Sequence, residues 1–100
     1  MSIEIADVVI PLNGRDAGKR FIVIGEEDEY SLLADGKCRR VEKPKRKKNK
    51  HVRREDGISG PIAEKLLKGE KVTNSEIRRV LIDVTHGVKG GMLDGEGRHD

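Results

Sequence analysis

The chain has 100 residues, of which 21 are Lys or Arg and 18 are Asp or Glu, and its formal net charge is +3. This length suits one domain with a small appendage and excludes a large multi-domain catalytic architecture. Its single cysteine excludes an internal disulfide and a zinc–thiolate cluster, and no apolar run approaches the roughly 18 residues of a membrane span.

The first predicted element is a strand within Ile3–Leu12, which is rich in β-branched residues that partly alternate. Glu4 and Asp7 stand where a signal peptide carries Lys or Arg, so we expect a cytoplasmic protein. A turn-rich connection over residues 13–19 leads to a second predicted strand, Phe21–Ile24.

Two further strands are predicted around a tight turn. Tyr30–Ala34 and Lys37–Val41 are short β-prone runs, and Asp35-Gly36 between them is a strong hairpin signal. The acidic run Glu26–Glu29 before them is interpreted as a solvated loop, because adjacent exposed carboxylates lack the burial and the facing partner that acid–base catalysis needs. Three or four short antiparallel strands suggest a small, strongly curved barrel.

The charge is concentrated in one segment. Residues 37–54 hold eleven basic side chains against one acidic one, whereas residues 1–36 and 55–100 have net charges of −5 and −2. Pro44 breaks the strand pattern and Lys45–Lys50 is too charged to pack, so we expect an extended basic arm over 43–57. This asymmetry is typical of a polyanion-binding element. The alternatives are a solubilising linker, or binding to anionic lipid without a large apolar anchor.

Helical periodicity begins after the arm. Ile58, Ile62 and Leu66 follow each other at intervals of four residues, with Pro61 suited to a first helical turn and Gly69 to a C-terminal stop.

A capping box over Thr73–Glu76 starts a second predicted helix, with Ile77, Val80, Leu81 and Val84 on one face. We therefore predict a helical pair over 58–85 that packs together and on the barrel or a partner. The glycine-rich residues 86–100 are interpreted as a flexible tail.

The loop from Gly14 to Lys19 superficially resembles a phosphate-binding loop. Only three residues separate Gly14 from Gly18, and Arg20 stands where a Walker motif needs Ser or Thr, so a nucleotide site is not expected. A tight turn, in which Gly18 adopts a conformation denied to other residues, explains the segment better.

The same residues resemble a known family. Asp7–Ile10, leading into Gly14–Lys19 and Phe21–Ile24, looks like a KOW motif, two β-strands around a loop with a key glycine, here Gly18. The continuation through Asp35–Lys37 and Lys43–His51 resembles the KOW-containing large-subunit ribosomal proteins of archaeal and eukaryotic type and their small bacterial relatives. The resemblance covers about residues 3–52. It implies an SH3-like β-barrel that binds RNA, often ribosomal RNA.

The expected fold is therefore mainly β with an α appendage. We predict an SH3-like (KOW) antiparallel barrel over 1–42, a basic extended arm over 43–57, a helical pair over 58–85 and a flexible tail over 86–100.

The expected function is binding of structured RNA, above all ribosomal RNA, through phosphate and shape contacts in a ribosomal or ribosome-associated protein. No membrane, cofactor or small-molecule substrate is expected. The candidate RNA-binding residues are basic and lie on the turn, the predicted last strand and the arm: Arg15, Lys19, Lys37, Arg39, Arg40, Lys43, Lys45, Arg46, Lys47, Lys48, Lys50 and His51.

The sequence gives less support to duplex DNA binding, base stacking, metal binding and catalysis. Duplex DNA is disfavoured because no predicted recognition helix carries the charge, and with Phe21 in the core only Tyr30 is left to stack on a base, although the rim of the core is its favoured position. His51, His86 and His99 lack the spacing of a metal site, and Cys38 has no base or resolving cysteine, so no enzyme is expected.

An alternative function remains open at this stage. KOW and Tudor-like barrels also bind proteins, so the chain could be an interaction module of the transcription or translation machinery, with the helical pair as its docking surface.

Overall fold

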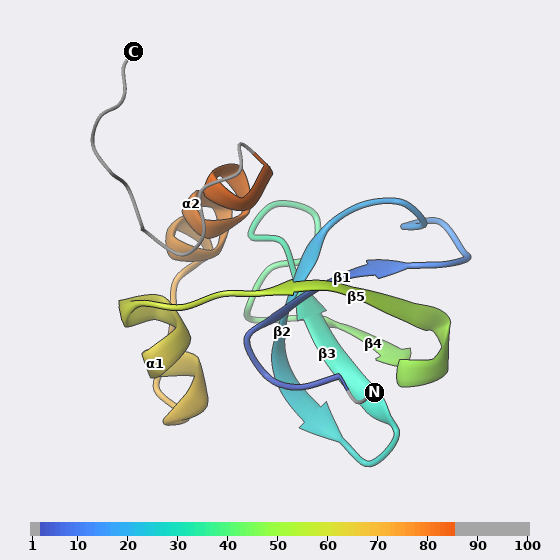
Figure 1. Cartoon of the computed structure of the whole chain (residues 1–100), viewed down its shortest axis with the longest axis horizontal. Coiled ribbons are helices and arrows are strands. Elements are labelled where there is room, and N and C mark those ends of the chain that lie inside the picture. The colour runs from blue at the N-terminus through green and yellow to red at the C-terminus, as the bar shows by residue number, and fades with distance from the viewer. Residues whose placement is uncertain (1–2, 86–100) are drawn as a thin grey trace.

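The structure, a computed structural model, describes residues 3–85 and contains one five-stranded antiparallel sheet and two helices (Figure 1). The strands are β1 (Asp7–Pro11), β2 (Phe21–Glu27), β3 (Tyr30–Ala34), β4 (Lys45–Lys48) and β5 (Val52–Gly57), with a 3₁₀ turn, η1 (Asn49–His51), before β5. The helices are α1 (Pro61–Leu67) and α2 (Asn74–Thr85). The strand order is β4-β3-β2-β1-β5, and the sheet does not close because the edge strands β4 and β5 do not pair with each other.

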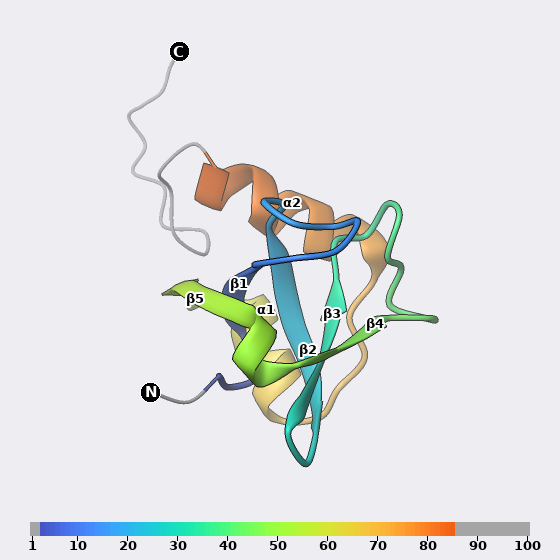
Figure 2. The same ribbon diagram turned by 90° about the vertical axis from the view of Figure 1, so that its right-hand side faces the viewer.

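The central pair β1–β2 is buried on both faces because its side chains alternate between two apolar clusters. The inner cluster contains Val9, Phe21, Val23, Leu33 and Val52. The outer cluster joins the sheet to the helices and contains Ala6, Val8, Ile22, Ala63, Leu66, Val72, Ile77 and Val80. The two helices therefore cover the part of the outer face that β1 and the start of β2 form, and Figures 1 and 2 show them on the side of the sheet away from β4. The expected mainly β fold with an α appendage is confirmed.

The helix boundaries follow their sequence signals. Gly60, with φ of 95°, caps α1 ahead of Pro61, and Gly69, with φ of 79°, lies just beyond its end. The predicted capping box of α2 is present, since Thr73 N donates to Glu76 Oε1 at 2.9 Å and Glu76 N donates to Thr73 Oγ1 at 3.1 Å.

The strand predicted at Lys37–Val41 is wrong. Asp35 Oδ1 accepts hydrogen bonds from the backbone N–H groups of Lys37 and Arg39, each at 2.8 Å, and Gly36 has φ of +80°. This local hydrogen bonding turns the chain and competes with strand pairing, as aspartate often does. Residues 35–44 are therefore a loop, which we call the β3–β4 loop.

The extended basic arm is also wrong in its local structure, because residues 45–48 and 52–57 are strands. Strand β4 pairs with β3 from Leu33↔Lys45 to Tyr30↔Lys48, and β5 pairs with β1. Lysines are tolerated here because an edge strand pairs on one side only, and its side chains reach water. The charge excludes burial in a core but does not exclude backbone pairing.

Smaller differences concern strand ends. The first strand begins at Asp7, after Ala6 with φ of 76°, and β2 runs on to Glu27. Of the acidic run, only Asp28 and Glu29 form the turn to β3. Strand β3 itself has the predicted bounds, Tyr30–Ala34.

The predicted flexible tail over 86–100 lies outside the described residues. Neither helix within residues 3–85 is long and apolar enough to cross a membrane.

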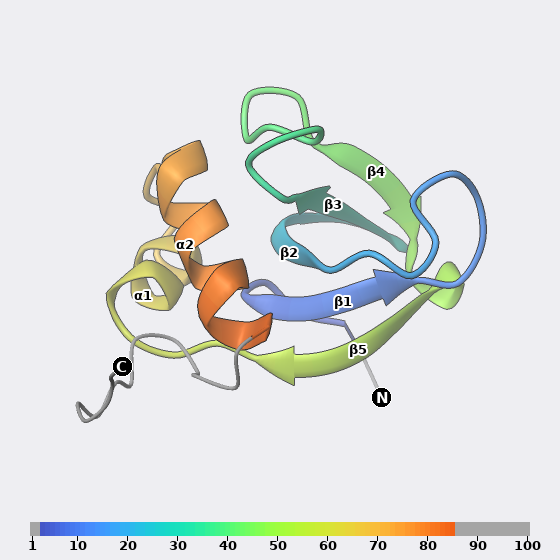
Figure 3. The same cartoon turned by 90° about the horizontal axis from the view of Figure 1, so that it is seen from above.

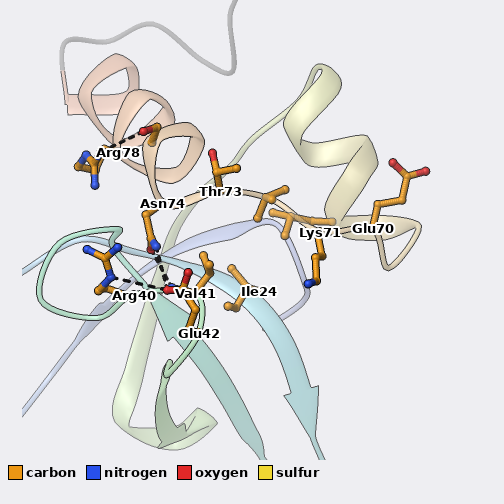
Figure 4. Close-up of a pocket in the computed structure, with 12 residues that line it drawn as sticks. Ile24, Arg40, Val41, Glu42, Glu70, Lys71, Thr73, Asn74 and Arg78 are labelled. Atoms are coloured by element: carbon orange, nitrogen blue, oxygen red, sulfur yellow. Dashed lines mark hydrogen bonds and ion pairs between the residues drawn. The ribbon is translucent and has the colours of Figure 1, made fainter.

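Two residues in the first half of α2, Asn74 and Arg78, attach the β3–β4 loop to the helices (Figure 4). Asn74 Oδ1 accepts a hydrogen bond from Val41 N at 2.8 Å, and Asn74 Nδ2 donates to Glu42 Oε1 at 2.9 Å. Arg78 Nη1 donates to the carbonyl of Gly36 at 2.6 Å. Gly36 lies so close to the Asn74 carbonyl that a Cβ atom there would clash with it. Helix α2 thereby fixes the path of the chain toward β4.

Replacement of Asn74 tests this attachment. Asn74 is only 8% exposed, so Asn74→Ala leaves the Val41 N–H without its partner, and we expect a loss of about 1–3 kcal/mol in the free energy of unfolding. Urea denaturation measures the change, with the exposed Arg79→Ala on the same helix as the control. Equal midpoints for the two variants would show that the loop does not depend on Asn74.

Candidate nucleic-acid interface

The four basic residues of β4 divide between the two faces of the sheet. Lys45 and Lys47 lie opposite Leu33 and Ser31, both fully buried on the inner side of the sheet. Arg46 and Lys48 lie opposite Leu32 and Tyr30 on the outer side. A pattern without apolar alternation in the sequence thus produces cations on both sides of one edge strand.

On the inner side, β4 lies against the turn that joins β1 to β2. Lys47 Nζ donates to the backbone oxygen of Asn13 at 3.2 Å and to Asn13 Oδ1 at 3.1 Å. A small hollow of about 50 Å³ is lined by Arg15, Lys45 and Lys47 among others. Residues about thirty positions apart in the sequence therefore form one basic surface.

On the outer side, Arg46 lies over the ring of Tyr30. Its Cζ is 3.6 Å from the ring centroid, and its Nε donates to Glu27 Oε1 at 3.0 Å. Lys48 Nζ is 5.8 Å from the same centroid. These contacts hold the arginine and the ring in one cation–π arrangement at the surface.

The 3₁₀ turn after β4 adds further basic residues next to those of β4 and of the β1–β2 turn. Lys50 is exposed, and His51 Nδ1 is 3.4 Å from Asn13 Nδ2. Ser31 Oγ donates to Asn49 Oδ1 at 2.5 Å and attaches the turn to β3. We call the whole surface the basic edge, and it comprises Arg15, Lys43, Lys45, Arg46, Lys47, Lys48, Lys50 and His51. Figures 1 and 3 show β4 on the side of the sheet away from the two helices.

Four predicted site residues lie elsewhere. Arg39 donates from Nε and Nη2 to Asp16 Oδ2 at 3.1 and 2.9 Å, in a partly buried ion pair. Arg40 is 3.6 Å from Glu42 beside the first turn of α2. Lys19 and Lys37 line a second hollow with the last turns of α2. Carboxylates thus occupy two of these four cations, and the helices border three of them.

Carboxylates also neutralise basic residues of β5 and its neighbours. Arg20 forms an ion pair with Glu55 at 2.6 Å, and Arg54 with Asp7 at 3.1 Å. The hydrogen bond from Arg20, with its charge, lowers the pKa of the Glu55 carboxyl. At the β3–β4 loop, the hydrogen bond from Asn74 lowers the pKa of Glu42. These carboxylates stay ionised at neutral pH. Among the described residues, the basic edge has one ion pair, between Arg46 and Glu27.

The sequence did not single out Asn13, which contacts both Lys47 and His51. An asparagine in a turn is ordinary, so only the tertiary contact identifies it. Within residues 3–85 the structure brings together no group of three or more His, Cys, Asp or Glu side chains that could hold a metal ion. Cys38 is exposed, and His86 and His99 lie outside the described residues.

Comparison of the chain with models of known protein families and with curated proteins finds no match.

The role of Arg39 is open to a direct test. Asp16 is 8% exposed, so Arg39→Met leaves a nearly buried carboxylate without its cation, and we expect a loss of about 1–3 kcal/mol in unfolding free energy. Thermal unfolding at neutral pH measures it. Lys37→Met, an exposed neighbour in the same loop, is the control and should change stability little. If Arg39→Met is as stable as the wild type, the ion pair with Asp16 does not stabilise the fold, and a ligand-binding role for Arg39 becomes the better explanation.

Proposed function

We propose that the chain is a non-enzymatic RNA-binding protein of the cytoplasm that binds structured RNA, above all ribosomal RNA. The observation that carries the proposal is the basic edge, where cations from the β1–β2 turn, from both sides of β4, from η1 and from the end of the β3–β4 loop line one edge of the sheet. Nucleic-acid affinity depends strongly on phosphate neutralisation, and an edge strand with cations on both sides follows a phosphate backbone along its length.

The edge contains cations that are available for phosphates. Within residues 3–85, no carboxylate pairs with Lys43, Lys45 or Lys50. Lys43 and Lys50 are exposed, and Lys45 is half-buried. An unpaired lysine releases a counterion from RNA without first losing an intramolecular partner.

We further propose that the curved sheet is an open SH3-like barrel of the KOW type. The strand order β4-β3-β2-β1-β5, with a 3₁₀ turn between the two edge strands, supports this proposal. So does the position of Gly18, which has φ of +83° and donates from its backbone N–H to Pro11 O at 3.1 Å across the β1–β2 turn. This glycine is the one that the KOW resemblance marks as its key residue.

The alternative of a protein-docking module gains less support. The apolar faces of both helices are largely occupied by the outer cluster, which includes Leu66, Ile77 and Val80. Exposed Leu67 and Ile82 remain on the helices, but they are isolated positions compared with the continuous basic edge. We therefore favour RNA binding over protein docking. The ribosome or other translation machinery as its setting is the part of the proposal that rests on the KOW resemblance.

Neutralising the unpaired lysines tests the proposal. We expect the triple variant Lys43→Gln, Lys45→Gln, Lys50→Gln to weaken binding of an rRNA hairpin and to reduce the slope of log affinity against log salt by about one unit for each lysine that contacts a phosphate. Fluorescence anisotropy between about 50 and 200 mM salt measures both quantities. If about six cations contact phosphates, wild-type affinity falls by roughly three decades over this range.

The matched control removes the same charge from the helical side, as Lys68→Gln, Lys71→Gln, Arg79→Gln. We expect this variant to retain most of the affinity and the full salt slope. Equal losses in the two triple variants would mean that binding depends on net charge alone, and would contradict a site at the basic edge.

A further inference from the structure

The outer side of the basic edge carries a group of contacts that phosphate binding does not require. Arg46 is fixed by two partners, the ring of Tyr30 and the carboxylate of Glu27. The partners in register on this face are Glu27, Tyr30 and Lys48, which lie across three neighbouring strands. The guanidinium of Arg46 thus lies over the half-buried ring, and Lys48 Nζ is 5.8 Å from the same ring centroid.

A hollow lies beside this ring. It is lined by Asp28, Glu29, Tyr30 and Lys48 and has a volume of about 530 Å³. Arg46, which covers the ring from above, is not among the lining residues. The hollow is an open depression at the surface, and Tyr30 borders it.

The charged side chains around the hollow favour a base over a phosphate as its ligand. Asp28 and Glu29 make no ion pair within residues 3–85, and two free carboxylates repel a phosphate group. They accept hydrogen bonds, however, and the amino groups on the edge of an unpaired base donate them. Lys48, at the same hollow, is placed for the phosphate that follows the base.

We propose that this hollow holds one unpaired nucleobase of the RNA, stacked on Tyr30 and hydrogen-bonded through its amino edge to Asp28 and Glu29. The inference rests on the proposed RNA-binding function and specifies the feature of the RNA that is bound, a bulged or looped-out nucleotide beside a helical stem. Guanine fits the acidic pair well because its exposed edge presents two neighbouring donors, whereas uracil offers only one.

Two hairpins with the same stem and number of phosphates test it, one with a single bulged guanosine and one with an abasic nucleotide at that position. We expect the full chain to bind the guanosine hairpin about 5- to 150-fold more tightly, as one stacked base contributes. Tyr30→Leu should remove this difference, and Tyr30→Phe should retain it. With 2-aminopurine in the bulge, binding to wild type should quench its fluorescence, and binding to Tyr30→Leu should not.

The outcomes separate the inference from the function on which it rests. Equal, salt-dependent affinity of the wild type for both hairpins would overturn the base site and leave the RNA-binding proposal standing. Failure to bind either hairpin at low salt would overturn both. A preference for bulged guanosine over bulged uridine that disappears in Asp28→Asn, Glu29→Gln would support the acidic pair, and a preference that persists would refute its role.

Discussion

The burial of the β1–β2 pair on both faces is the constraint on which the rest of the molecule depends. Val9, Phe21 and Val23 face the interior of the curved sheet, while Val8 and Ile22 face outward. A chain with two aromatic residues cannot fill a large core, and uncovered outer side chains would be costly to hydrate. The helices meet this constraint, since their apolar residues complete the outer cluster, and this explains why a mainly β fold carries an α appendage.

The covering helices also connect the core to the charged end of the molecule. Asn74 and Arg78 hold the β3–β4 loop by hydrogen bonds to Val41, Glu42 and Gly36. The loop leads directly into β4. Because the loop is held in place, it fixes where β4 starts to pair with β3. The cations of the basic edge are thus placed by ordinary backbone pairing and by helix packing, with no requirement that they find burial themselves.

Local signals in the sequence predicted the parts of the fold whose physics is local. The capping box at Thr73, the glycine after α1 and the bounds of β3 follow from propensity and hydrogen bonding within a few residues. The strand β4 could not be predicted from its own side chains, because Lys45–Lys48 has no apolar alternation and its stability comes from pairing with β3. The separation of Arg39 from the site likewise depends on Asp16, a contact between distant turns.

The central claim is that RNA lies along the basic edge and away from the helices, and hydrogen–deuterium exchange of the full chain with and without an rRNA hairpin tests it most directly. The account predicts slower amide exchange on RNA binding in the β1–β2 turn, in β4 and in η1, with little change in α1 and α2. Slower exchange confined to α1 and α2 would contradict it and would place the binding surface on the helices instead.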